Sequence, residues 1–78
     1  MLIVYSKSSG EIRGIYSGDL QSIDSLYGKD AQEYKIIWDE LKLEDDEYIL
    51  NNWRNFIVDV NNGNILKLKD AEELRKYL

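Results

Sequence analysis

Cysteine, histidine and proline are all absent from this chain of 78 residues. Without cysteine, the chain has neither a disulfide nor a thiolate zinc site. The missing histidine removes the commonest general base and the commonest metal ligand in proteins. Because no proline or glycine-serine linker interrupts the chain, we expect residues 1–78 to form a single small α+β domain.

Long hydrophobic runs are also missing. The apolar opening, Met1–Tyr5, is much shorter than the hydrophobic segment of a secretory signal, and no basic residues precede it. No stretch approaches the roughly 20 apolar residues that cross a bilayer. We therefore expect a cytoplasmic protein that does not contact a membrane.

Large aromatic side chains are plentiful and make up 12% of the chain. They bury much area per residue, which helps a short chain without disulfides to build a core. A chain of this length still buries only about 60% of the surface that it exposes when unfolded. Self-association would bury more, so we expect a homo-oligomer as one state of the protein.

Two segments have the pattern of a β-hairpin, at about residues 2–16 and 55–68. Each has an apolar run, a polar turn that ends in Gly10 or Gly63, and aliphatic residues two and five positions later. Glycine supplies the positive φ that such turns require. We predict that the two hairpins form one small antiparallel sheet of about four strands.

Two to four short helices are expected beside this sheet. Asp19 has the character of an N-cap, and Gly28 would end the helix that follows it. Asp30 and Glu33 have the spacing of a capping box for a second helix. Residues 31–41 fit either a helix or a strand, and their periodicity slightly favours a helix.

Two further helices are predicted in the second half of the chain. Asp45 or Asp46 would cap a short helix, and acidic residues in its first turn would complement the helix dipole. A C-terminal helix is predicted over residues 71–77, with Asp70 as its N-cap.

The whole charge imbalance of the chain lies in the acidic run, Asp39–Glu47. It holds six acids and one lysine, a net charge of −5, and the remaining residues hold nine acids and nine bases. Such a concentration of charge attracts basic partners. We expect the run to face water as one contiguous surface. The predicted partner-binding residues are its six acids and the tyrosine that follows: Asp39, Glu40, Glu44, Asp45, Asp46, Glu47 and Tyr48.

No catalytic, cofactor-binding or metal-binding residues are predicted. The serines have no histidine to activate them. The acidic run lacks the spacing of a calcium loop. The segment Asp59–Asn64 is similar to the start of such a loop, but Gly63 comes one position early, and a hairpin turn explains these residues better. We therefore expect that the protein is not an enzyme.

Direct binding to nucleic acid is not expected, because the ten basic residues are dispersed and outnumbered. The sequence favours a non-catalytic protein–protein interaction or assembly module, whose acidic face binds a protein with a basic surface. The alternative is an acidic inhibitor that mimics nucleic acid and blocks such a surface.

Two segments carry a resemblance to a class of proteins. The chain has the general character of small acidic proteins that lack cysteine. The segments that carry this character are Val4–Ile12, VYSKSSGEI, and Asp45–Asn52, DDEYILNN. In this respect it resembles such proteins in the phages and prophages of Gram-positive bacteria. The resemblance implies a role in virion assembly or host interaction, with the host-cell cytoplasm as the compartment, and it assigns no functional residue.

Overall fold

The strands of the protein form two separate antiparallel sheets. The computed structural model describes residues 1–18 and 21–69. Its strands are β1 Leu2–Ser6, β2 Ile12–Tyr16, β3 Trp38–Lys42, β4 Phe56–Asp59 and β5 Ile65–Leu68. Its helices are α1 Ile23–Tyr27, α2 Ala31–Ile37 and α3 Glu47–Asn52, with 3₁₀ turns at Gly28–Asp30 and Trp53–Asn55. The first sheet has the order β2-β1-β3, and the second pairs β4 with β5.

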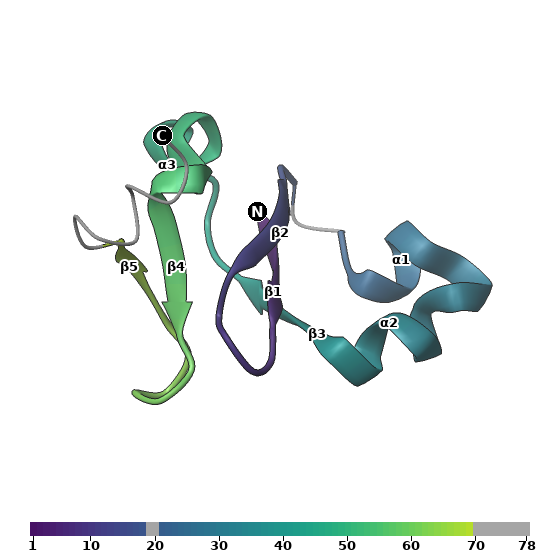
Figure 1. The fold of residues 1–78 in the computed structure, drawn as a ribbon. Helices are drawn as coiled ribbons and strands as arrows, with labels where there is room; N and C mark the ends of the chain where they lie inside the picture. The colour runs from purple at the N-terminus through teal and green to yellow at the C-terminus, as the bar shows by residue number, and fades with distance from the viewer. Residues whose placement is uncertain (19–20, 70–78) are drawn as a thin grey trace.

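This architecture confirms the α+β class and both predicted hairpins, and it corrects the prediction of one four-stranded sheet. The second hairpin does not join the sheet of the first. Instead β3, from the region between the hairpins, pairs with β1 along its whole length. Figure 1 shows the result as three layers, with α1 and α2 on one side of the central sheet and β4 and β5 on the other.

The central strand β1 has a buried side chain at every position. Leu2 and Val4 pack into one core with α1 and α2, whereas Ile3 and Tyr5 pack into a second core with Val58 of β4. Side chains alternate between the two faces of a strand, so a continuous apolar run fits a strand that is covered on both faces. The opening sequence of the chain therefore determines this layered arrangement.

A β-bulge in β2 adapts that strand to the second core. The pairing runs Val4 to Gly14 and then Tyr5 to Ile12, which leaves one extra residue in β2. Ile12 and Ile15 would lie on opposite faces of a regular strand, but both pack against the core of Ile3, Tyr5 and Val58. The extra residue thus brings both isoleucines to the same face.

The helical regions differ from the predictions in their capping. Ser22 is the N-cap of α1 and forms a capping box with Ser25, while Asp19 lies outside the described residues. Gly28 ends α1 as predicted, with a positive φ of 54°. The predicted capping box of Asp30 is wrong, because α2 continues directly from a 3₁₀ turn and Asp30 already has helical backbone angles.

The ambiguous segment 31–41 contains both structures that its sequence allows. It is helical to Ile37, and β3 begins at Trp38. The predicted helix over residues 71–77 lies outside the described residues. In the described ranges 1–18 and 21–69, no helix has the length and apolar character needed to span a membrane.

Candidate functional site

The acidic run is divided among three elements, so it does not form one contiguous face as expected. Asp39 and Glu40 lie in β3, Glu44 and Asp45 lie in the connection that follows, Asp46 is the N-cap of α3, and Glu47 and Tyr48 begin that helix. In β3, Asp39 pairs with Tyr5 and Glu40 pairs with Val4. Because Tyr5 and Val4 face different cores, the two acids project from opposite faces of the sheet.

Asp39 lies in β3, which is an edge strand of the central sheet. Its carboxylate accepts hydrogen bonds both from a backbone N–H group and from a side-chain hydroxyl. Two hydrogen bonds flank the pairing of β3 with β1: Leu43 N–H donates to Met1 O, and Lys7 N–H donates to Ile37 O. They show that the odd-numbered residues of β3 direct their backbone N–H and C=O groups toward β1. The even-numbered residues therefore direct theirs outward. The Glu40 N–H donates to Asp39 Oδ1 at 2.8 Å, so Asp39 occupies one of these outward groups.

The outward N–H of Trp38, the next one along the edge, is occupied too, because it donates to Tyr34 O in the last turn of α2. Two of the three outward N–H groups of β3 thus have intramolecular acceptors. Free edges invite pairing with other chains, and an occupied edge resists it. On the sheet face, the Tyr5 hydroxyl donates to Asp39 Oδ2 at 3.5 Å, and burial together with this carboxylate raises the pKa of Tyr5.

Glu40 is half-buried, and it contributes little to an exposed acidic surface. Only 24% of its side chain is exposed, and its Oε2 atom has no hydrogen-bond donor among the described residues. The Lys42 ammonium lies 3.9 Å from that atom.

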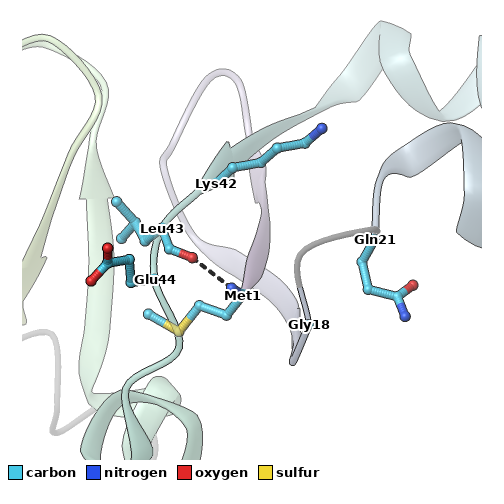
Figure 2. Close-up of a pocket in the computed structure, with 6 residues that line it drawn as sticks. All are labelled: Met1, Gly18, Gln21, Lys42, Leu43 and Glu44. Atoms are coloured by element: carbon cyan, nitrogen blue, oxygen red, sulfur yellow. Dashed lines mark hydrogen bonds between the residues drawn. The ribbon is translucent and has the colours of Figure 1, made fainter.

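Asp45 is neutralised by the amino group of Met1. Its Oδ1 lies 2.6 Å from that nitrogen, and the Gly18 N–H donates to both carboxylate oxygens at 3.2 and 3.3 Å. The amine, followed by the Gly18 hydrogen bonds, lowers the pKa of Asp45 below its usual value. The same amine donates to Leu43 O at 2.5 Å, as Figure 2 shows. Asp45 therefore ties the connection after β3 to β1 and to the end of β2.

A shallow pocket of about 270 Å³ lies beside this ion pair (Figure 2). Its lining among the described residues comes from four segments: Met1, Gly18, Gln21, Lys42, Leu43 and Glu44. The Lys42 and Glu44 side chains extend away from each other in Figure 2. In the same described ranges, no cluster of three or more acids could hold a metal ion.

The chain is continuously exposed from Lys42 to Tyr48, and we call the part that follows Lys42, from Leu43 to Tyr48, the 43–48 segment. Leu43 is 39% exposed and Tyr48 is 61% exposed. The carboxylates of Glu44 and Glu47 form no hydrogen bond or ion pair with any residue that the structure describes. Within the part of the chain that the structure describes, the segment therefore presents Leu43 and Tyr48 together with two carboxylates that have no partner.

Two local contacts give this segment its shape. The Asp46 carboxylate accepts a hydrogen bond from Ile49 N–H at 3.2 Å, which confirms the predicted N-cap of this helix. The Tyr48 and Phe56 rings form a T-shaped pair, with ring centroids 6.1 Å apart. The Asp46 carboxylate thus caps α3, while Tyr48 contacts Phe56 and keeps 61% of its surface exposed.

A cluster of Arg13 and aromatic residues was not predicted from the sequence. The Arg13 guanidinium lies 5.6 Å from the Tyr34 ring centre and 5.4 Å from that of Trp38, and Tyr34 stacks on Tyr27 at 3.8 Å. Hydrogen bonding to Tyr27 raises the pKa of Arg13. The cluster joins β2 to α2 and β3. Its formation depends on the β-bulge in β2, and no local signal in the sequence predicts that bulge.

The chain matches no protein-family model, no curated protein and no solved structure at a significant level.

Proposed function

We propose that this protein is a non-catalytic protein–protein interaction module that binds a basic protein surface through its 43–48 segment. The observation that carries the proposal is the exposure of Leu43 and Tyr48 beside the unpaired carboxylates of Glu44 and Glu47. Aromatic and aliphatic anchors supply most of the binding energy at interfaces, and surrounding charges steer the encounter and select the partner.

The contact between Tyr48 and Phe56 supports this role. Side chains that are already restrained in the free protein lose less conformational entropy when they bind. Tyr48 is restrained by its T-shaped contact with Phe56, yet 61% of it remains exposed. It can therefore act as an anchor that is ordered before the partner arrives.

The distribution of charge favours this function over mimicry of nucleic acid. A mimic needs a row of free negative charges, because phosphates contribute one charge at each regular step. In the acidic run, Asp45 binds the Met1 amine, Glu40 is half-buried, and the carboxylates of Asp39 and Asp46 accept hydrogen bonds from backbone N–H groups. The two remaining carboxylates, those of Glu44 and Glu47, are too few to imitate the regular row of negative charges along a phosphate backbone.

A comparison of two double variants tests the proposal. E44Q/E47Q removes two charges from the 43–48 segment, and E11Q/E33Q removes two exposed charges elsewhere, so both variants have a net charge of −3 instead of −5. Each protein, with Y48S as a third variant, is immobilised and used for a quantitative pull-down from a lysate at low and at high salt. Circular dichroism checks that all variants are folded.

We expect at least one basic protein that the unmodified chain and E11Q/E33Q both retain, and that E44Q/E47Q and Y48S lose. Its retention should fall only partly at high salt, because the apolar anchors are not screened. Equal loss from both double variants would indicate a non-specific charge effect and contradict the proposal. Binding that is abolished by salt but unaffected by Y48S would favour mimicry instead.

A further inference from the structure

The turn between β4 and β5 contains the one asparagine–glycine pair in the sequence, Asn62–Gly63. This pair lies outside the acidic run and plays no part in the proposed function. We propose that Asn62 is a site of spontaneous deamidation, and that loss of its amide releases the contacts that Asp59 makes across this turn.

The reacting nitrogen belongs to Gly63, and its surroundings leave it accessible. Among the described residues, the Gly63 N–H donates no hydrogen bond, whereas the N–H groups of Asn61, Asn62 and Asn64 all donate to Asp59. Apart from Gly63 and its two chain neighbours, no atom of the described residues lies within 4 Å of the position that a Gly63 Cβ would take. Glycine has no side chain to shield its nitrogen, and both residues of the pair are exposed.

The chemistry needs only water and hydroxide. The Gly63 nitrogen gives up its proton and attacks the Asn62 Cγ, so a new N–C bond forms. The bond from Cγ to Nδ2 then breaks, and the nitrogen leaves as ammonia with the displaced proton. Water opens the resulting five-membered succinimide at either carbonyl, which produces aspartate or isoaspartate at position 62. Each product carries one more negative charge than asparagine.

Asn62 is a main contact of the Asp59 carboxylate. Its Nδ2 donates to Asp59 Oδ2 at 2.7 Å, and this is the largest cause of the lowered pKa of Asp59. The Lys67 ammonium lies 3.4 Å from the same oxygen. The backbone carbonyl of Asp59 accepts from Asn64 N–H at 2.9 Å, which closes the turn. Asp59 thus connects both strands of the hairpin.

Deamidation changes the attractive contact between the residue 62 side chain and Asp59 Oδ2 into a repulsive one. A carboxylate at position 62 has no proton to donate near neutral pH, so two acceptors would face each other. Like charges at this distance raise each other's pKa and favour separation. In the isoaspartate product the backbone is also one carbon longer, which moves Asn64 N–H relative to the Asp59 carbonyl. We therefore expect the turn to open.

The first test is an ageing experiment on the intact chain. The protein is incubated at mildly alkaline pH, and anion exchange with peptide mass spectrometry follows the products. We expect a species with one additional negative charge, and deamidation at Asn62 before any other asparagine. The N62Q variant keeps the amide but would need a larger ring, so it should not form this species. Conversion of another asparagine first, or equal ageing of N62Q, would overturn the proposal.

The second test measures the consequence for the turn. N62D imitates the main charge change, and Q32E makes the same amide-to-acid change at an exposed site on α2. By NMR we expect N62D to raise the pKa of Asp59 and to speed hydrogen exchange at the Asn64 amide, while Q32E alters neither. An Asp59 titration that is the same in N62D and in the unmodified chain would contradict the role assigned to Asn62.

Discussion

The backbone N–H of Val58 donates a hydrogen bond to the carbonyl of Gly10 at 2.9 Å, which joins the turn of the first hairpin to the first strand of the second. The approach is so close that a Cβ on Gly10 would lie 1.8 Å from Val58 O. Gly10 also has a φ of +79°. Both the conformation and the space at this position therefore require glycine.

Replacing Gly10 with alanine should destabilise the protein strongly. A non-glycine residue at a positive φ costs about 1 kcal/mol or more, and displacement of Val58 adds to this cost, so we expect a total of more than about 2 kcal/mol. Gly63 is a matched control because its φ is +80° and, apart from its two chain neighbours, no described residue lies within 4 Å of its Cβ position. Urea unfolding of G10A and G63A measures the difference. Equal losses of stability would show that the contact with Val58 does not constrain the chain.

Acid should weaken the contact between Asp45 and the Met1 amine. The pKa of Asp45 is lowered in the folded protein from a usual value of 3.8, so its contribution to stability is present above that value. The contribution is lost as the pH falls through the lowered pKa. D45N should therefore unfold more easily near neutral pH and show a weaker dependence of stability on pH in the acid range.

The dependence of stability on pH should be smaller in D45N but should not disappear, because the pKa of Asp59 is lowered as well, mainly by Asn62. Thermal unfolding followed from neutral pH to about pH 2, well below the usual pKa of 3.8, measures the effect. D30N is a suitable control, since Asp30 is exposed and forms no ion pair with a described residue. A D45N curve that is parallel to that of D30N would contradict this role of Asp45.

Asp39 should protect the edge of β3. D39A frees the outward N–H of Glu40, and we expect the variant to associate increasingly as its concentration rises, because an open edge pairs with other strands. D39N keeps an oxygen that can accept this hydrogen bond and should resemble the unmodified chain. Light scattering over a range of concentrations compares the three proteins. Equal masses for D39A and D39N at every concentration would show that Asp39 has no such effect.

Features that depend on a few neighbouring residues were predictable from the sequence. Gly10 and Gly63 mark both hairpin turns, Gly28 ends α1, and Asp46 caps α3. Each of these follows from the conformational range of glycine or from an acceptor beside free N–H groups. The division into two sheets was not predictable in this way, because it depends on β3 pairing with β1 from more than thirty residues away.

The candidate site was predictable only in part, for a similar reason. The concentration of charge is visible in the sequence, but the partner that neutralises Asp45 is a backbone amine, which a count of side chains omits. Asp39 and Glu40 project from opposite faces of the sheet because they lie in a strand, whereas the periodicity of this segment favoured a helix. The exposed Tyr48 agrees with the sequence analysis, and the predicted homo-oligomer stays a prediction.

The position of β1 between two cores has a consequence for how the molecule comes apart. The helical layer and the β4–β5 layer each cover one side of the same five-residue strand. If either layer separated from β1, apolar side chains of the strand would be exposed to water, and the other layer would then pack against a strand that is covered on one face only. Local opening that is confined to one half should therefore be rare, and the described portion of the chain should melt as one cooperative unit.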